Sequence, residues 1–589
     1  MTLHDETSAG TNRAGQAGKA GKAAPGVFAA AGLIAVVTLA ARVFGFGRWL
    51  VFSQSVGTTC VGSVYQAANQ LPNVFFEVAA GGALAAVVVP IIAGQLARQN
   101  TAEAARTASA MLTWTLAVLV PLSILMATSA RQLSTFLVDD NRCAGSADLM
   151  ASMLVVFSPQ IALYGVGIVL AGVLQAHRRF LGVVVAPLLS SLVVMATYLL
   201  FAALAQGRVN DLAGLPGQAS IVLAVGTTLG VAALSLPLLI PVHRAGIRLR
   251  PIWSFPVGVA RRAGALAGAG LLALVAQQAA VLVTLWVSQH RGGTGTLNVY
   301  IYVQAIYLLP YAVLAVPFAM SALPALATGL DQAVLATGLD RTSLATGPDH
   351  ASLATGPDHA PLARAQSTLA SSARAIIVST SAGAAVLFAI GSPTGTFFSA
   401  LDAGRHSPAG HEALAALPGA LSAFAPGLVG FGMAALLTRA LYVQGRPAVA
   451  GGLVALGWFI AAIVPLLMLQ GDAGPRRTLL LLGLASSLGM TVAAVGLFVA
   501  VRRVWGPKAF RGFGRSAGVA LGASVLSAAA GRSLAAALHQ EGLVAGAVVA
   551  ALVAVVVVTF FAGVIWIGDR GSARLALAKL PVLGRRRWR

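Results

Sequence analysis

Long apolar runs, each close to the length of a membrane-crossing helix, make up most of the chain. A helix of about 20 apolar residues spans the hydrocarbon core of a bilayer and satisfies its backbone hydrogen bonds internally. Short segments rich in polar residues separate fourteen such runs. The runs lie at residues 28–51, 62–92, 110–129, 149–174, 182–205, 218–241, 263–288, 298–325, 373–398, 422–444, 448–470, 478–500, 516–537 and 542–567. The pattern predicts an all-α integral membrane protein with about 14 transmembrane helices.

Composition supports the same class and argues against a soluble enzyme. Hydrophobic residues make up 58% of the 589 residues and charged residues 10%, against about 25% charged residues in a typical soluble domain. The sequence holds no Walker loop, no GxSxG motif with a matching acid and histidine, and no paired carboxylates. We therefore expect no enzymatic activity, no cofactor and no bound metal.

The basic residues are distributed unevenly between the two sides of the membrane. Of 39 Lys and Arg residues, 29 fall in the tails, loops and adjoining run ends on one side, 8 fall on the other side, and Arg42 and Arg48 lie inside the first run. Loops rich in Lys and Arg stay in the cytoplasm. The split predicts a multi-pass protein of the bacterial cell membrane with both termini cytoplasmic. It also explains the net charge of +22 without a nucleic-acid partner.

Three segments fall outside the apolar runs. Residues 1–26 are polar and small, which predicts a disordered cytoplasmic tail, and residues 569–589 form a basic cytoplasmic tail that we expect to contact anionic lipid. The cytoplasmic loop 326–364 contains a tandem nonapeptide, LATGLDQAV followed by three variants of it. A linker of turn residues is the expected interpretation. Metal binding by His350 and His359 is the alternative.

Three ionisable residues lie at membrane depth: Arg42, Arg48 and Glu77. Such residues are costly in a bilayer and usually face a cavity or a partner. Arg42 and Arg48 are six residues apart with two glycines between them, so both guanidinium groups could turn towards one cavity and hold an anion. The alternative is that Arg48 extends to the membrane surface while Arg42 pairs with Glu77.

The second run carries a polar stripe and two expected breaks. Its side chains Gln66, Asn69, Gln70 and Asn73 are spaced three and four residues apart, which places them on one helix face. Such a face either lines an aqueous path or holds helices together. We expect Pro72 and the pair at 81–82 to open the helix. Gln277, Gln278, Tyr302 and Gln304, on later runs, are expected to hold helices together.

The two cysteines, Cys60 and Cys143, fall on the same outer side of this topology. Two free thiols are expected, with a disulfide as the alternative.

Five stretches resemble the MurJ/MviN family of lipid II flippases, within the multidrug/oligosaccharidyl-lipid/polysaccharide exporter superfamily. The resemblance is to a divergent member of actinobacterial type. The stretches are ARVFGFGRWLVFSQSVG (41–57), NQLPNVFFEVAAGGALAAVVVPIIA (69–93), YGVGIVLAGVLQAHRRFLGVVVAPLLSS (164–191), LLPYAVLAVPFAMSALPALA (308–327) and GFGMAALLTRALYVQGRPAVAG (430–451).

The resemblance implies a flippase that moves lipid II or a related polyprenyl-diphosphate glycolipid from the inner to the outer leaflet for peptidoglycan synthesis. It implies alternating access without ATP. Two six-helix lobes, residues 27–241 and 242–505, would surround a central cavity, and residues 506–568 would add two helices that form a groove for a lipid tail. Arg42 and Arg48 would hold the diphosphate, and the polar face of the second run would meet the sugar. The implied partners are the lipid-linked glycan precursor, membrane lipids and cell-wall synthesis proteins.

The chain departs from the family pattern at several cavity positions. Ser63 stands where the family has Asp, Phe76 and Ala305 stand where it has Arg, and Ser190 or Ser191 replaces an Asn. Two alternatives therefore stay open: an exporter of small amphipathic compounds, and a non-transporting scaffold for cell-wall synthesis.

Overall fold

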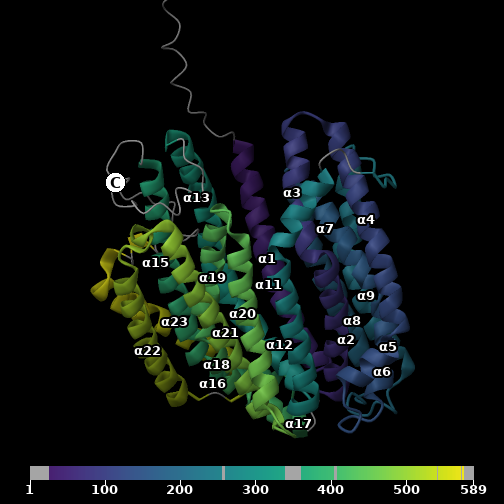
Figure 1. Ribbon diagram of the computed structural model, residues 1–589. Helices are drawn as coiled ribbons and strands as arrows, with labels where there is room; N and C mark the ends of the chain where they lie inside the picture. Colours follow the sequence, from purple (N-terminus) through teal and green to yellow (C-terminus); the bar gives the residue numbers. More distant parts are fainter. Residues whose placement is uncertain are drawn as a thin grey trace, which may run out of the picture.

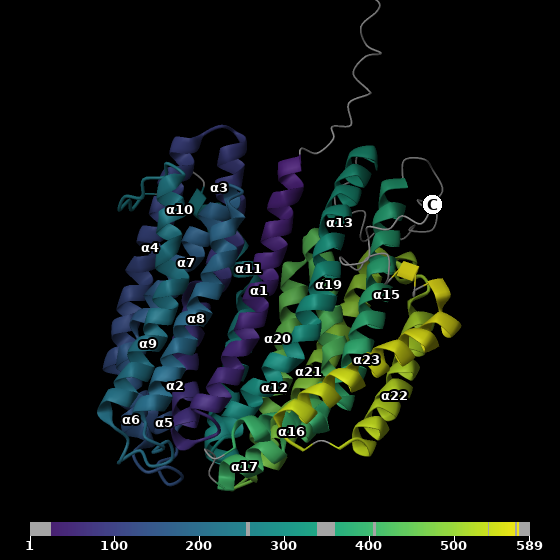
Figure 2. The ribbon, with the colours of Figure 1, turned by 180° about the vertical axis from the view of Figure 1, so that it is seen from behind.

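The chain folds into a set of roughly parallel helices, arranged as two bundles side by side (Figures 1 and 2). The computed structural model describes residues 25–254, 259–337, 360–403, 408–539, 541–571 and 574–575. Within these ranges all regular structure is helical, as the sequence predicts.

The first bundle is built by the helices that precede residue 245. Contacts are most extensive between α8 and α9, between α1 and α8, and between α4 and α7. Its elements are α1 (Pro25–Ser55), α2 (Cys60–Phe76), η1 (Glu77–Gly81), α3 (Gly82–Ala97), α4 (Thr101–Thr128), α5 (Ala130–Leu137), α6 (Ser146–Phe157), α7 (Pro159–Ala176), α8 (Phe180–Leu204), α9 (Gly217–Ser235), η2 (Leu236–Leu238) and α10 (Leu239–Arg244).

The second bundle contains the remaining helices, and α22 and α23 pack on its outer side against α15 and α16 (Figure 2). Its elements are α11 (Val259–Val287), η3 (Ser288–Gly292), α12 (Thr296–Pro310), η4 (Tyr311–Ala315), α13 (Val316–Thr337), α15 (Ala360–Ala389), α16 (Gly391–Leu401), α17 (Pro408–Ala415), α18 (Leu417–Phe424), α19 (Gly427–Val443), α20 (Pro447–Met468), α21 (Gly474–Trp505), η7 (Pro507–Phe510), α22 (Phe513–Ala537) and α23 (Leu543–Gly568).

Every predicted apolar run overlaps a helix or a series of consecutive helices. Among the described residues, eleven of these segments are long and apolar enough to cross a membrane, or twelve if the bent pair Pro408–Phe424 and Gly427–Val443 is one span. The exact number of fourteen is not confirmed by this criterion. The prediction of an all-helical, multi-pass membrane protein is confirmed.

The second predicted run opens at one of the two places expected. α2 continues through Pro72 without interruption, and the irregular turn is the π-helix η1 at Glu77–Gly81. A proline late in a helix can be accommodated when its missing N–H is compensated locally. The expected break at Pro72 is therefore wrong, whereas the break expected beside Gly81 and Gly82 is present.

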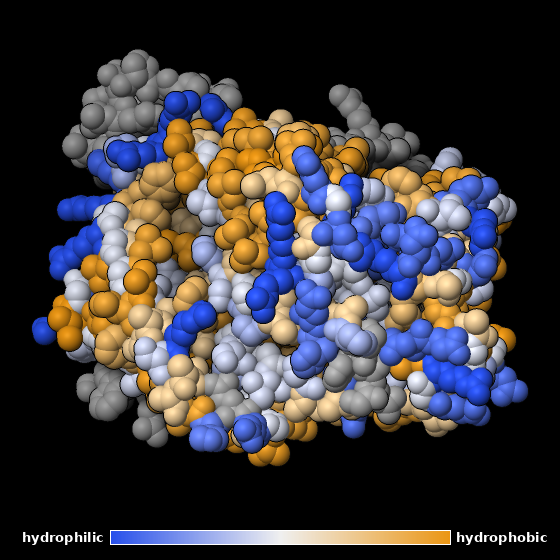
Figure 3. Space-filling view, turned by 90° about the horizontal axis from the view of Figure 1, so that it is seen from below, coloured by the Kyte–Doolittle hydropathy of each residue, from blue (hydrophilic) through white to orange (hydrophobic). Residues whose placement is uncertain are grey.

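Cys60 and Cys143 form a disulfide, so the expectation of two free thiols is wrong. Cys60 begins α2 and Cys143 lies in the loop before α6; the fold brings their Cα atoms to 6.0 Å, within the range a disulfide requires. We call this end of the molecule the disulfide end. Viewed from it, hydrophilic side chains are spread over the surface between apolar patches (Figure 3).

The nonapeptide repeat is only partly described. Its first copy, 326–334, and the first three residues of its second copy continue α13, which ends at Thr337, and α15 begins at Ala360. Most of the repeat, including His350 and His359, lies outside the described residues.

Candidate functional site

A cavity of about 580 Å³ lies between the two bundles and contains both arginines of the first helix. Its lining comes from α1, α8, α9 and α12. The two arginines, together with Ser190 and Ser191, provide polar groups, and Val184, Leu234 and Leu309 are among the apolar ones. The predicted convergence of Arg42 and Arg48 on one hollow is therefore present in the structure.

The two guanidinium groups occupy different levels of this cavity. Arg42 is exposed, and Arg48 lies six residues further along α1, about 9 Å closer to the disulfide end. Arg48 is half-buried, with its guanidinium carbon 5.1 Å from the centre of the Trp49 ring. Its Nε atom is buried and makes no hydrogen bond with any described residue. An anion entering the cavity would satisfy this donor.

The alternative arrangement of the arginines is not found among the described residues. No ion pair joins Arg42 to Glu77 there. Glu77 is half-buried in the π-helix η1, with its carboxylate folded over Gly81. Arg42 is therefore available to a ligand rather than engaged with Glu77.

A second cavity, of about 380 Å³, adjoins the first on the side of the second bundle. Trp49 and Ala305 line both cavities. Three amides line the second one, Gln70, Gln277 and Gln304, along with aromatic side chains that include Tyr300 and Trp458. Gln304 donates a hydrogen bond of 3.0 Å from Nε2 to the Tyr300 hydroxyl. Amides and aromatic rings of this kind suit a sugar, with polar edges and apolar faces.

The four side chains of the polar stripe on α2 lie in different environments. Of its four members, only Gln70 lines one of these two cavities. Gln66 is 1% exposed, and its Nε2 has no hydrogen-bond partner among the described residues. Asn69 and Asn73 are half-buried. The rotation of α2 thus directs one amide into the hollow and leaves the rest of the stripe beside it.

The positions where the chain departs from the family pattern also separate in space. Ser190, Ser191 and Ala305 line the first cavity. Ser63 lies at the disulfide end, where its hydroxyl accepts a hydrogen bond of 2.8 Å from the Gly295 N–H. Phe76 is buried, 5.7 Å from the Tyr164 ring. The cavity is consequently less charged than the family pattern would make it, and Arg42 and Arg48 supply its positive charge.

Hydrogen bonds between the bundles close the molecule at the disulfide end. Asp402, after α16, accepts hydrogen bonds from the Thr58 N–H and hydroxyl. Asn298 Nδ2 donates to the Gly57 carbonyl at 2.7 Å. Gln289 Nε2 donates to the Ser63 carbonyl at 3.2 Å. These partners cannot be predicted from the sequence, because nothing in the local pattern shows which distant turn a polar group will contact.

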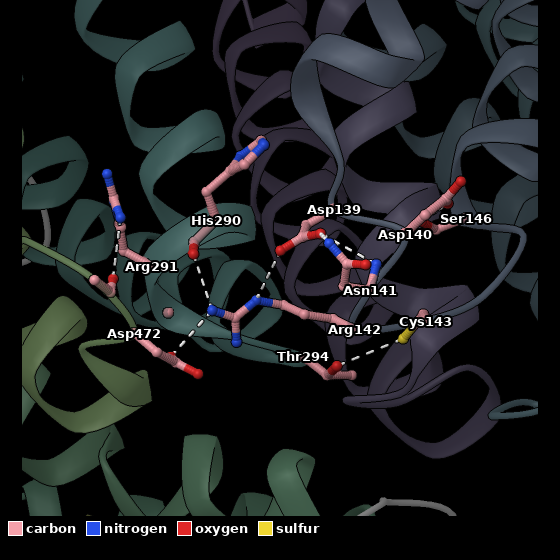
Figure 4. A network of polar contacts seen from close by, with 12 residues as sticks. Asp139, Asp140, Asn141, Arg142, Cys143, Ser146, His290, Arg291, Thr294 and Asp472 are labelled. Atoms are coloured by element: carbon pink, nitrogen blue, oxygen red, sulfur yellow. Dashed lines mark hydrogen bonds and ion pairs between the residues drawn. The ribbon is translucent and has the colours of Figure 1, made fainter.

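Arg142 adds an outer layer to this closure. Its Nη2 donates to the His290 carbonyl at 2.9 Å and to the Asp472 carboxylate at 3.0 Å, and its Nε lies 3.6 Å from Asp139 (Figure 4). Cys143 lies beside Thr294 in the same view. The loop that carries the disulfide in the first bundle is thereby tied to the second bundle.

Local hydrogen bonds stabilise the ionised carboxylate of Asp140, in the same loop. The Ser146 hydroxyl donates to its carboxylate at 2.6 Å and the Ala147 N–H at 2.8 Å. These donors hold the pKa of Asp140 below its ordinary value. The carboxylate caps the start of α6 in its ionised form.

An apolar groove of about 840 Å³ lies between α15, α19, α21 and α22. Its lining includes Phe388, Met433, Phe498 and Phe513. The resemblance places a groove for a lipid tail at the last two helices, and α22 forms one wall of this one. α23 does not line it.

The described residues contain no group of three or more His, Cys, Asp or Glu side chains able to hold a metal ion. The side chains that line the two cavities between the bundles include guanidinium, hydroxyl, amide and aromatic groups.

Comparison with known proteins gives a family match and several similar curated sequences, two of which are described. The family model described as lipid II flippase MurJ matches residues 52–346, half of the chain. A protein of Rhizobium tropici named probable lipid II flippase MurJ is 27% identical over 164 residues, 27% of this chain and 30% of the relative. A protein of the same name from Rhizobium meliloti (strain 1021) is 27% identical over 222 residues, 36% of this chain and 38% of the relative. The chain therefore matches about a third of the length of these relatives.

Solved structures show the same fold. A structure described as lipid II flippase MurJ, inward closed conformation, aligns with a TM-score of 0.64 and 15% identity, covering 91% of this chain and 99% of its own. An inward-facing multidrug resistance MATE family transporter of the MOP superfamily aligns with a TM-score of 0.59 and 13% identity, covering 80% and 97%.

Proposed function

Because the chain belongs to the MurJ family of lipid II flippases, we propose that it moves lipid II or a related polyprenyl-diphosphate glycolipid from the inner to the outer leaflet. The family acts in transport rather than in bond making or breaking. Peptidoglycan synthesis is the process that would use such a lipid-linked precursor.

The arginine pair in the cavity between the bundles supports this proposal most directly. A diphosphate carries negative charge that two guanidinium groups can bind through paired hydrogen bonds. The half-buried Arg48 has a buried Nε donor with no partner among the described residues. We propose that Arg42 meets the diphosphate first, and that Arg48 binds it deeper in the cavity. The polyprenyl chain would stay in the bilayer.

The glycan would then occupy the adjoining cavity. Gln70, Gln277 and Gln304 offer amide donors and acceptors, and Trp49 lies between the two cavities. The other predicted substrate residues, Gln66, Asn69, Asn73 and Glu77, line neither of these cavities in this conformation. Their contact with the sugar is a proposal for another stage of the cycle.

The closure at the disulfide end fits one state of an alternating-access cycle. We propose that this end faces outwards and that both termini are cytoplasmic, as the split of basic residues predicts. The structure would then correspond to a state closed towards the outside. Transport requires the hydrogen bonds between the bundles at this end to break and similar contacts to form at the other end.

Complementation of a strain depleted of its own lipid II flippase tests the proposal. The wild-type chain should restore growth, and Arg42→Ala with Arg48→Ala should abolish it while membrane abundance stays normal. Arg178→Ala, an exposed loop arginine, is the matched control and should complement. Failure of the wild-type chain, or full activity of the double variant, would exclude the proposal.

The same experiment separates the two alternatives. A scaffold would complement with the cavity arginines removed, because it needs no cargo site. An exporter of small amphipathic compounds would change the drug-resistance profile without restoring growth, and the positive cavity disfavours cationic compounds.

A further inference from the structure

A basic pocket of about 520 Å³ lies outside the cavity between the bundles, at the end of the molecule opposite the disulfide. It is formed by the first half of α15 and the turn that contains η7. Three cations line it, Arg374, Lys508 and Arg511, together with the polar side chains Gln366 and Ser367. None of the functional residues discussed above takes part in it.

Hydrogen bonds between α15, α19 and the turn that contains η7 hold the pocket in shape. Gln366 Nε2 donates a hydrogen bond of 2.8 Å to the Trp505 carbonyl, and Trp505 Nε1 donates to the Ala440 carbonyl at 3.1 Å, so the turn is fixed against α15 and α19. Gly512 has a φ of 78°, which favours glycine. A Cβ atom there would lie 3.5 Å from Arg374 Nη1, an ordinary contact distance, so the backbone conformation and not a lack of space favours glycine.

The positive charge of the pocket is not balanced within the described part of the chain. No acidic side chain there pairs with Arg374, Lys508 or Arg511. Arg374 Nε makes a long hydrogen bond of 3.4 Å to the Ala370 carbonyl. Like charges that line one pocket repel one another, and an anion bound between them would offset that repulsion. The arrangement favours a group with several negatively charged oxygens.

The depth of the pocket matches the headgroup layer of a bilayer. The predicted apolar run of α15 begins at residue 373, next to Arg374. Along α15, positions 363, 367, 370 and 374 line the pocket, and positions 377, 384 and 388, on the continuing helix face, line the apolar groove. The same change occurs after η7, where Gly512 lines the pocket and Phe513, the first residue of α22, lines the groove. An anionic headgroup site therefore leads directly into an acyl-chain site.

We propose that this pocket binds the phosphate headgroup of an anionic membrane phospholipid, with an acyl chain in the adjoining groove. Basic pockets between membrane helices on the cytoplasmic side commonly bind such lipids. The pocket and the cavity between the bundles share no lining residue. A headgroup held here thus lies off the proposed transport path, which favours a resident phospholipid over the cargo.

Native mass spectrometry of the full-length protein in detergent tests the site without requiring transport. The probes are phosphatidylglycerol, phosphatidylcholine, inorganic phosphate and a polyprenyl diphosphate. The pocket variant combines Arg374→Gln, Lys508→Gln and Arg511→Gln. The matched control combines Arg98→Gln, Arg106→Gln and Arg503→Gln, which removes the same charge from exposed positions. A second variant, Ala529→Trp, fills the groove from an exposed lining position.

The wild type and the control should bind phosphatidylglycerol in preference to phosphatidylcholine. The pocket variant should bind it about a hundredfold more weakly, about fivefold for each cation removed. Ala529→Trp should weaken phosphatidylglycerol binding and leave the unfolding temperature of lipid-free protein unchanged.

Three outcomes would overturn the proposal. The pocket variant could retain phosphatidylglycerol, inorganic phosphate alone could bind, or only the polyprenyl diphosphate could depend on the three cations. The last outcome would instead identify a cargo docking site. Each is independent of the complementation experiment, because binding is measured without flipping.

Discussion

The carboxylate of Asp402 accepts hydrogen bonds from both the backbone N–H and the hydroxyl of Thr58, a residue 344 positions earlier in the chain. Both residues are fully buried. Gly57, with a φ of 72°, leaves space for the carboxylate, since a side chain there would collide with it. This contact joins the two bundles at the disulfide end, so any opening of that end must break it.

Replacing Asp402 by Asn should favour opening at the disulfide end. Asn keeps the shape but loses the charge, and hydrogen bonds to a charged group contribute about 1.5–3 kcal/mol. A cysteine introduced at the buried Ser53 of α1 should then react with a membrane-impermeant maleimide about tenfold faster than in the unaltered background. The native cysteines are held in the disulfide.

Asp148→Asn is the matched control for this variant. Asp148 pairs with Arg131 within the first bundle, and its side chain is 75% exposed. Exposed ion pairs contribute little to stability. An equal increase in labelling by both variants would show that the effect is not specific to the contact between the bundles.

Replacing Arg48 by Lys should reduce transport by about tenfold, and Arg48→Gln should reduce it further. Lysine keeps the charge but lacks the planar fork that binds two phosphate oxygens together. The measurement is flipping of a fluorescent polyprenyl-diphosphate glycolipid in proteoliposomes. Arg178→Lys should have no effect. Full activity of Arg48→Lys and Arg48→Gln alike would remove Arg48 from the cargo site.

Loss of the disulfide should lower stability substantially. Cys60 and Cys143 are 83 residues apart, and closing a loop of that length contributes about 4.5 kcal/mol in the chain-entropy account. The double variant Cys60→Ser with Cys143→Ser should unfold at a lower temperature than the wild type in detergent. Adding a reductant should lower the wild-type value towards that of the variant and leave the variant unchanged.

Acid should remove a small stabilising contribution from Asp140. Its pKa is lowered in the folded state by the Ser146 hydroxyl and the Ala147 N–H. The contribution is therefore complete above the unfolded value of about 3.9 and is lost as the pH falls through the lower folded value. Asp140→Asn should abolish this part of the pH dependence when unfolding temperature is measured across that range. A wild-type and variant profile of identical shape would contradict this assignment.

The sequence was sufficient to predict the helices, because a run of about 20 apolar residues has few structural options in a membrane. The sequence also indicated Arg42 and Arg48 as candidate anion-binding residues, since charged groups at membrane depth are rare and costly. Both conclusions depend on local composition and not on how the helices pack.

The packing of the helices determines features of the structure that the sequence does not predict. The spacing of Gln66, Asn69, Gln70 and Asn73 showed a shared face but not its direction, and the contacts of α2 turn only Gln70 into a cavity. The Thr58 contact with Asp402 and the disulfide each join segments far apart in sequence, so no local pattern predicts them. The basic pocket likewise could not be predicted from the sequence, because its cations come from α15 and from a turn more than a hundred residues later.

The bond between Cys60 and Cys143 also reports on the compartment in which the protein matures. Thiols in the bacterial cytosol are kept reduced, whereas oxidants outside the inner membrane join them. A cross-link at this end therefore supports the proposal that this surface is the translocated one, by an argument separate from the count of arginines.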